Sequence, residues 1–253
     1  MVSETKLRQK TPVFINSFNQ PTYVQNSVNW LSENGFENVT VMDNDSTSPE
    51  LLEYFRSEAF SSKARLWALG KNIGPRYAIL EIIQEHGDEA PFIFSDPDIA
   101  LPRPPANNFL TRLFELAEKH NVIKVGLALD ISRPELFRGL EIVRPNGRRV
   151  RAEQWERRYW KHAIEKNVFS ASVDTTFFLY VPGRDVTQCR LRHFGYRQPK
   201  APSIRVAGEG FVAQHRPWYI DDGMTDAERQ FYVDSSKSVA SWSRNSGAKR
   251  EAT

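Results

Sequence analysis

Residues 12–34 read PVFINSFNQPTYVQNSVNWLSEN, and this stretch decides the fold class. Its beginning, Pro12 to Ser17, is a short apolar run of the kind that forms a buried strand. Its remainder, Pro21 to Asn34, carries apolar residues at the spacing of one helix face. A strand that leads directly into an amphipathic helix is the first part of a βαβ unit, so the sequence predicts an α/β protein.

The same alternation of strand and helix continues to about residue 95. Further strands are predicted at 39–42, 65–69 and 91–94, with one helix that starts at Pro49 and another over 75–86. Strands separated by such helices form a parallel sheet, whose ligands bind beyond the carboxyl ends of the strands. After Pro105 the pattern is less regular and predicts one helix and three strands, at 109–120, then 122–129, 173–181 and 204–213.

The composition is that of a soluble globular protein. Of the 253 residues, 40% are hydrophobic and 26% are charged, and the net charge is +3. This charge suits an anionic ligand such as a nucleoside diphosphate and is too weak to indicate nucleic-acid binding. Cys189 is the only cysteine, so no intrachain disulfide is expected. The polar N-terminus and the lack of a long apolar stretch predict a cytoplasmic protein, with peripheral association at the inner face of a membrane left open.

Two carboxylates follow the fourth predicted strand. Residues 92–99 read FIFSDPDI, so an apolar run ends in Asp96 and Asp98, which Pro97 joins in a stiff turn. Carboxylate oxygens are preferred ligands of Mg²⁺ and Mn²⁺, and such an ion can bridge a diphosphate. The alternative is a solvated turn capped by aspartate. A second Asp-x-Asp at 43–45 shows that the motif alone is weak, but its position after a strand favours a metal site.

Four segments of the first 100 residues, taken in order, resemble one family. They are VFINSFNQPTYV at 13–24, DNDS at 43–46, NIGPRY at 72–77 and SDPD at 95–98. In order and spacing they resemble the GT-A-fold glycosyltransferases, especially family 2. The resemblance implies a GT-A (Rossmann-like) nucleotide-diphospho-sugar transferase fold with a mostly parallel central sheet. The pattern along the chain predicts a single domain, with a nucleotide-sugar-binding half at about 11–105, an acceptor half at about 106–235 and a flexible tail rich in Ser, Lys and Arg at 236–253.

The resemblance also implies roles for the residues at the strand ends. Asp98 would hold Mn²⁺ or Mg²⁺, and Asp96 would reach the metal or the ribose. The implied donor-binding residues are Asn16, Phe18, Asp43, Asn44, Arg76 and Asp96. Structural alternatives stay open, since Asn16 could cap the following helix, Asp43 could lie at a helix dipole, and Arg76 could be a solvated helix residue.

A polar and aromatic cluster, GEGFVAQHRPWY, occupies residues 208–219. His215 resembles the C-terminal histidine with which some GT-A enzymes complete the metal site, and imidazole is an acceptable ligand for Mn²⁺. Trp218 is predicted to stack on the acceptor, since aromatic faces suit the apolar faces of sugar rings. The alternative is a core tryptophan beside a histidine whose hydrogen bonds are satisfied.

Asp174 is the predicted catalytic base. An inverting transfer, which only the family 2 resemblance favours, needs a carboxylate to take the proton of the acceptor hydroxyl. Asp174 stands at the start of the predicted strand 173–181, where partial desolvation would raise its pKa. Asp130 and Glu209 are the rivals, and a turn-capping role is the structural alternative.

Residues 144–161, RPNGRRVRAEQWERRYWK, are rich in arginine and aromatic residues. Such a stretch could bind nucleic acid, yet the spacing of Trp155 and Tyr159 suggests a helix with one packed aromatic face. Our interpretation is a loop and helix near the donor diphosphate or an anionic acceptor. A solvated basic face is the alternative.

These patterns predict a metal-dependent glycosyltransferase of the hexosyltransferase type. It would move a sugar from a nucleotide-diphosphate sugar to a glycan or lipid-linked acceptor, in cell-surface polysaccharide synthesis. A sugar nucleotidyltransferase is disfavoured because the loop at 16–20 has no glycine or cation to grip a triphosphate. A non-catalytic carbohydrate-binding protein is the third reading, and RNA is disfavoured because Asp96 and Asp98 would repel phosphate without a metal.

Overall fold

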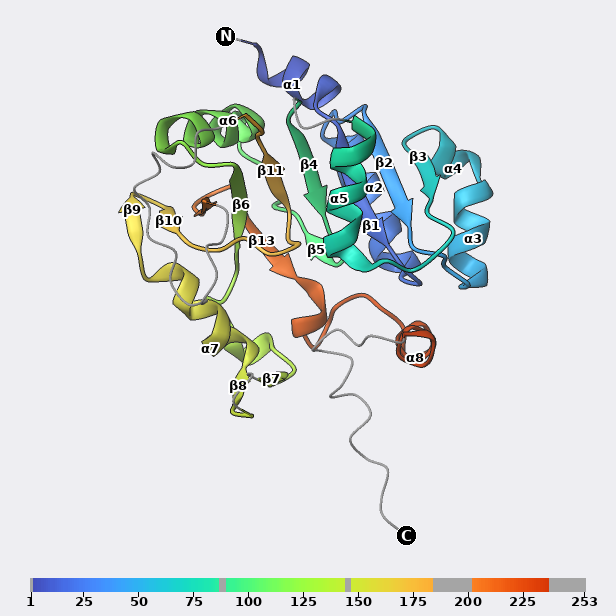
Figure 1. Cartoon of the computed structure of the whole chain (residues 1–253). Helices are drawn as coiled ribbons and strands as arrows, with labels where there is room; N and C mark the ends of the chain where they lie inside the picture. Colours follow the sequence, from blue (N-terminus) through green and yellow to red (C-terminus); the bar gives the residue numbers. More distant parts are fainter. Residues whose placement is uncertain (1, 87–89, 144–146, 184–201, 237–253) are drawn as a thin grey trace.

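A mixed sheet of eleven strands runs through the residues that the computed structural model describes, which are 2–86, 90–143, 147–183 and 202–236 (Figure 1). The first half of the sheet is parallel, in the strand order β3-β2-β1-β4. Its strands are β1 (Val13–Ser17), β2 (Val39–Asp43), β3 (Arg65–Ala68) and β4 (Phe92–Ser95). Because these strands run the same way, their carboxyl ends lie along one edge. The predicted α/β, Rossmann-like fold class is confirmed.

The second half of the sheet is joined to the first by one antiparallel strand. This strand, β11 (Phe178–Tyr180), pairs with β4 on one side and with β6 (Lys124–Leu129) on the other. The sheet then continues through β12, which is parallel to β6, and through two antiparallel strands. The remaining bounds are β5 (Ile99–Ala100), β9 (Ala163–Glu165), β10 (Val168–Ser170), β12 (Ser203–Val206) and β13 (Val212–His215).

Two predicted strands differ from the observed ones. The strand predicted over 173–181 forms only at Phe178–Tyr180. The strand predicted over 204–213 is two strands, β12 and β13, because the chain turns at Gly208 and Gly210, which have φ values of 96° and 75°. A Cβ atom on Gly210 would come within 2.3 Å of the Ala106 nitrogen, so this turn needs glycine for space as well as for conformation.

Helices cover both faces of the sheet, and four of the eight described α-helices begin near the predicted residues. They are α1 (Glu4–Lys10), α2 (Pro21–Glu33), α3 (Pro49–Arg56), α4 (Glu58–Ser61), α5 (Gly74–His86), α6 (Phe109–His120), α7 (Ala152–Glu156) and α8 (Asp226–Ser235). Helices α1, α4 and α8 have no counterpart among the predicted elements. None of the described helices is both long and apolar enough to span a membrane. The predicted tail lies outside the described residues apart from Ser236.

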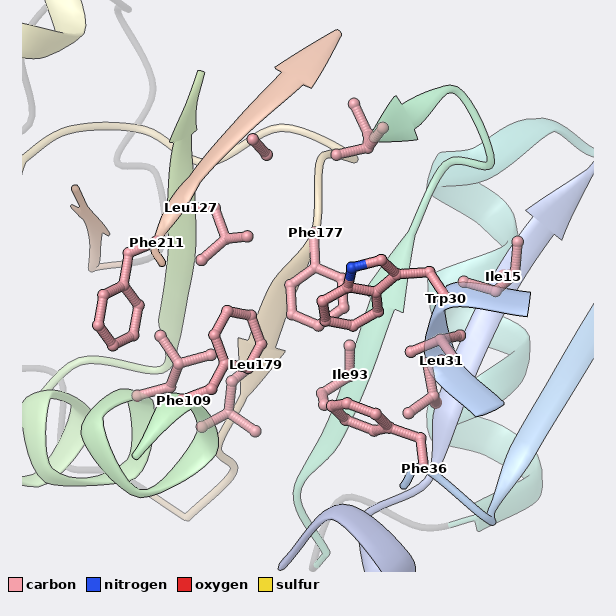
Figure 2. Packing of buried hydrophobic residues seen from close by; sticks show 14 of the residues in the cluster. Ile15, Trp30, Leu31, Phe36, Ile93, Phe109, Leu127, Phe177, Leu179 and Phe211 are labelled. Carbon is pink, nitrogen blue, oxygen red and sulfur yellow. The ribbon is translucent and has the colours of Figure 1, made fainter. Parts of the chain in front are cut away.

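The hydrophobic core is divided by the sheet. On one face, side chains of α2, α3 and α6 pack against the strands in one large cluster. Figure 2 shows the centre of this cluster, where Trp30 of α2 and Ile93 of β4 lie together with two phenylalanines. These are Phe109 of α6 and Phe177, which directly precedes β11. On the other face a smaller cluster joins Ala78 and Ile82 of α5 to β1, β2, β4 and β11. This packing holds the carboxyl ends of β1, β2 and β4 in fixed positions.

Candidate functional site

A chain of hydrogen bonds joins the polar residues at the ends of β1, β2 and β4. The Asn16 amide donates to Asp96 Oδ1 over 3.3 Å, and the Asn44 amide donates to Asn16 Oδ1 over 2.8 Å. Asn44 Oδ1 in turn accepts the backbone N–H groups of Ile73 and Gly74 at the start of α5. The parallel topology thus brings together Asn16, Asn44 and Asp96, as expected from their positions after the strands.

Asp43 and Asn44 are occupied by internal hydrogen bonds. Asp43 is buried, and its carboxylate accepts the Ser46 N–H (3.0 Å), the Ser46 hydroxyl (2.5 Å) and the Ser17 hydroxyl (3.3 Å). Burial raises its pKa despite these donors. Asn44 is only 1% exposed, and both ends of its amide are in use, since the nitrogen donates to Asn16 and the oxygen accepts from the Ile73 N–H. In this conformation both side chains shape the loops at the sheet edge.

Phe18 and Arg76 lie at the rim of the candidate site. Phe18 is half-buried after β1, and its ring lies 6.3 Å from that of Tyr232 in α8. Arg76, in the first turn of α5, is exposed. Both side chains keep enough freedom to meet a ligand at the carboxyl ends of the strands.

Three carboxylates cluster after β4. Burial raises the pKa of Asp96 well above its usual range, and the charges of Asp98 and Asp174 raise it further. Burial also raises the pKa of Asp98, which is 6% exposed, whereas the neighbouring His215 lowers it. Ionised carboxylates held this close repel one another, so the cluster favours a bound cation or a proton.

The pairing of β13 with β5 brings His215 to this cluster. His215 lies opposite Ile99, and the Arg216 N–H donates to the Asp98 carbonyl oxygen over 2.9 Å. As a result, His215 Nε2 lies 3.6 Å from Asp98 Oδ2. Two buried atoms here, Asp98 Oδ1 and His215 Nδ1, have no hydrogen-bond partner. Buried polar atoms without partners are rare in folded proteins and often mark the place of an ion or a water.

The predicted metal ligands therefore fit a divalent cation in chemistry but are not arranged around one. Asp96, Asp98 and His215 supply hard oxygen and imidazole nitrogen donors, and Asp98 and His215 have unused atoms. Among the described residues, no three His, Cys, Asp or Glu side chains form a group with metal-binding geometry. Asp96 already accepts hydrogen bonds from Asn16 and from the Thr175 hydroxyl. Binding of a cation would require these side chains to turn toward it.

The raised pKa of Asp96 leads to a prediction for the protein without metal. We expect Asp96→Asn to raise the free energy of unfolding by about 1 kcal/mol at pH 7. Asparagine can keep hydrogen bonds to Asn16 and Thr175 while it removes a charge that the fold disfavours. The folded-state pKa of Asp96 lies above the usual value of 3.8, so the wild-type protein gains stability as the pH falls and Asp96 becomes protonated. The stability advantage of Asp96→Asn should therefore be smaller at pH 5 than at pH 7.

Urea unfolding in EDTA at pH 7 and pH 5 measures this difference. Glu85→Gln, at an exposed position of α5, is the matched control and should change stability little at either pH. A variant that is less stable than the wild type at pH 7 would contradict the prediction.

Asp174 lies beside the acid cluster but not in the setting that the sequence suggested. It precedes β11 by several residues and is exposed, so the expected desolvation at the start of a buried strand is wrong. Its neighbour Thr175 is bonded to Asp96 through both its hydroxyl and its carbonyl oxygen, which accepts the Asp96 N–H over 2.8 Å. The segment 174–175 therefore borders the site, and an exposed carboxylate there remains accessible to an acceptor.

Trp218 is placed in the core. It is 7% exposed, it belongs to the large hydrophobic cluster, and one face of its ring stacks on His215 at 4.8 Å. The centre of the Phe137 ring lies 6.3 Å from the centre of the Trp218 ring. In this conformation Trp218 offers little surface to a sugar, and its contact with His215 holds that imidazole in position.

The basic stretch was predicted as a loop and a helix, and the structure divides it into a strand and two short helical segments. Its described part begins with β8 (Arg149–Arg151), which pairs with β7 (Glu141–Val143), and continues through the short α7 into a 3-10 helix over Arg157–Trp160. The predicted aromatic face does exist in another form, because the Arg158 guanidinium lies 3.3 Å from the centre of the Trp155 ring and 4.4 Å from that of Tyr159. In Figure 1 this region lies on the side of the molecule opposite α3 and α8.

Helix α8, which was not among the predicted helices, reaches the carboxyl end of β1. Tyr232 of α8 contacts Phe18, and Glu228 of α8 accepts hydrogen bonds from Thr22 at the start of α2. A signal for this helix was present, since Thr225 followed by Glu228 is a capping-box pattern. The Thr225 hydroxyl does accept the Glu228 N–H over 3.1 Å.

The fold and the site define a Rossmann-like α/β protein with an acid cluster at the edge of its sheet. No protein-family model matches the sequence, and no curated protein matches it. Several solved structures share parts of the fold at 10–15% sequence identity. One is described as a glucose-1-phosphate thymidylyltransferase from Bacillus anthracis in complex with a sucrose, with 11% identity and a TM-score of 0.36 over 53% of this chain and 61% of that one.

Two further structures are similar to the same degree. One is the apo structure of the bifunctional glycosyltransferase WbbM, with 15% identity and a TM-score of 0.37 over 68% of this chain and 31% of that one. The other is a cytidylyltransferase from Leptospira borgpetersenii serovar Hardjo-bovis, with 10% identity and a TM-score of 0.33 over 46% of this chain and 53% of that one. The chain thus spans less than two thirds of each of these proteins. TM-scores this low do not carry an activity from one protein to another.

Proposed function

We propose that this protein is a metal-dependent glycosyltransferase that uses a nucleotide-diphosphate sugar as donor. The observation that carries the proposal is the acid cluster after β4, in which burial raises the pKa values of Asp96 and Asp98 and the charge of Asp98 raises that of Asp96 further. The cluster lies at the carboxyl edge of a parallel sheet, where ligands of such folds bind. A site that disfavours its own negative charges is suited to a divalent cation and, through it, to a diphosphate.

Each group of the site has a part in this proposal. Mn²⁺ or Mg²⁺ held by Asp98, with Asp96 and His215 beside it, would neutralise the charge of the departing nucleoside diphosphate. Asn16, which is bonded to Asp96, and Phe18, at the rim beside Tyr232, are suited to contact the ribose and base. Asp174 is exposed beside Asp96, where a carboxylate can accept the proton of an acceptor hydroxyl. Trp218 is left out of the acceptor site because its ring is covered.

A sugar nucleotidyltransferase is the second candidate, and the loop between β1 and α2 argues against it. Such an enzyme must bind a triphosphate through free backbone N–H groups and cations. In this loop Asn19 is fully buried, and its side-chain oxygen accepts the N–H groups of Thr47 and Ser48 over 2.7 and 2.9 Å. The Asn19 N–H itself donates to the Ser46 hydroxyl. The loop is held closed, with no cation among residues 16–20.

Thermal unfolding with a panel of nucleoside diphosphates tests the proposal. We expect one diphosphate to raise the Tm only when Mn²⁺ or Mg²⁺ is present, because the cation links the carboxylates to the phosphates. A ligand at one hundred times its Kd stabilises the folded state by about 2.7 kcal/mol, which is a readily measured shift. The matching nucleotide sugar should then be hydrolysed or transferred by the protein.

The same panel separates the alternatives. Formation of a nucleotide sugar from a nucleoside triphosphate and a sugar phosphate would favour the nucleotidyltransferase. Binding of free sugars without any effect of nucleotides or metal would favour the carbohydrate-binding protein. Glycans and lipid-linked sugars are the acceptors to test first, in keeping with a proposed role in cell-surface polysaccharide synthesis at the cytoplasmic face of a membrane.

A further inference from the structure

Helix α8 is fixed across the mouth of the candidate donor site by contacts near both of its ends. Near its start, the Glu228 carboxylate accepts the Thr22 N–H over 3.0 Å and the Thr22 hydroxyl over 2.6 Å. At its end, the Ser235 hydroxyl accepts from the Asn19 amide over 2.9 Å. Thr22 and Asn19 belong to the segment that links β1 to α2, so α8 is tied to the edge of the sheet where the donor is proposed to bind.

The helical repeat places Tyr232 between these two anchors. Residues 228, 232 and 235 are separated by four and three positions, so they lie on one face of α8. With both ends of that face fixed to the loop, the Tyr232 side chain must point toward the sheet edge. There its ring lies 6.3 Å from the Phe18 ring at an interplanar angle of 66°.

The hydroxyl end of Tyr232 lies near the acid cluster. Burial raises the pKa of Tyr232, and the charges of Asp98 and Asp96 raise it further. The side chain is nevertheless partly exposed, so solvent or a ligand can reach it. Tyr232 therefore lies beside Phe18, on the base side of the proposed site, and feels the charge of the carboxylates on the phosphate side.

The connection that precedes α8 is also fixed. The Asp222 carboxylate is 2% exposed and pairs with Arg229 of α8 over 2.5 Å and with Arg138 over 3.3 Å. Buried charge pairs of this kind are costly to separate once formed. This third attachment holds α8 against the body of the protein independently of the two contacts to the loop.

We propose that α8 forms the roof of the donor site and that Tyr232 is a donor-binding residue, which covers the base or ribose opposite Phe18. This inference rests on the proposed function. An aromatic ring at this position can stack on a base with little sequence preference, and its hydroxyl can reach a ribose or phosphate oxygen. The roof excludes water from the diphosphate side of the site, which strengthens the electrostatic interactions beneath it.

Calorimetric titration with the nucleoside diphosphate and Mn²⁺ tests this role. We expect Tyr232→Ala to weaken binding about tenfold or more, and Tyr232→Phe to retain the part of the affinity that depends on the ring. The matched control is Phe231→Ala, since Phe231 is the adjacent residue of α8 and is 38% exposed. The control should bind like the wild type.

Hydrogen exchange supplies a second readout that a merely structural role of Tyr232 would not move. In the wild type we expect residues 226–235 to exchange more slowly once the diphosphate and Mn²⁺ are bound. Unchanged affinity of Tyr232→Ala, tighter binding by that variant, or unchanged exchange in α8 would each overturn the role of α8 while leaving the proposed function intact. A wild-type protein that binds no nucleoside diphosphate in the presence of Mn²⁺ would overturn both.

Discussion

Replacing Asp98 by asparagine is expected to lower kcat/KM for sugar transfer by about a thousandfold or more, the loss that follows when a metal no longer stabilises a leaving diphosphate. Asparagine keeps the size of the side chain but removes the charge that would hold the cation. Asp98 is 6% exposed and burial raises its pKa, so the loss of its charge should leave the metal-free fold intact or slightly more stable. Transfer rates and metal-free unfolding together measure both effects.

The control for this variant is Glu118→Gln, which removes an exposed carboxylate on α6. It should leave transfer, metal dependence and stability unchanged. Transfer by Asp98→Asn near the wild-type rate, or wild-type transfer that continues in EDTA, would contradict a metal at Asp98. A variant that fails to fold would instead show that Asp98 is needed for the turn between β4 and β5.

Arg205→Met is expected to lower the free energy of unfolding by about 3–5 kcal/mol, with a fall in Tm on the order of 10 °C. Arg205 and Glu156 form a buried ion pair, and each is 2% exposed. The Arg205 guanidinium also donates to the Ser172 carbonyl oxygen over 2.8 Å and lies 4.1 Å from the centre of the Tyr159 ring. Removal of the arginine leaves a buried carboxylate without its main partner.

The pH dependence of this loss has a defined sign. Burial raises the pKa of Glu156 to about 7 even with Arg205 and Arg158 nearby, and the loss of Arg205 would raise it further. Because the pKa of Glu156 is raised, ionisation of this carboxyl lowers the stability of the folded state. The loss of stability in Arg205→Met should therefore be largest above pH 7, where Glu156 ionises, and smaller at pH 6. Urea unfolding at pH 8 and pH 6 measures the difference.

Two controls accompany this prediction. Arg149→Met removes an arginine that is 64% exposed and pairs with Glu141 over 3.3 Å, and it should cost less than about 1 kcal/mol. The double variant Arg205→Met/Glu156→Leu should recover much of the lost stability, because no buried charge remains. Equal losses in the single and double variants would show that the charge of Glu156 is not the cause.

The parallel half of the fold could be predicted from the sequence because its signals are local. Each of β1, β2 and β4 is a short apolar run, both α2 and α3 begin with proline, and Ser48 caps α3. The break between β12 and β13 could not be predicted, because it depends on the close approach of Gly210 to Ala106, a residue about a hundred positions away. The anchored face of α8 makes polar contacts, so it lacks the apolar periodicity by which helices are recognised.

The candidate site was predictable to a similar extent. The acids after β4 and the asparagines after β1 and β2 do meet, because parallel strands bring their ends together. The internal bonding of Asp43 could not be foreseen, since it depends on where the Ser46 and Ser17 hydroxyls point. The exposure of Asp174 is a similar case, because β11 begins five residues later than the apolar pattern suggests.

The position of β11 in the chain has a consequence for synthesis on the ribosome. Strand β4 is complete once Ser95 has been made, but its second neighbour in the sheet is β11, which ends at Tyr180. Until then the edge of β4 has no partner, although all four of its residues are buried in the finished protein. Open apolar strand edges promote association between chains. The nascent polypeptide therefore passes through an interval of some 85 residues, about 4–17 s of elongation, in which chaperones are most needed.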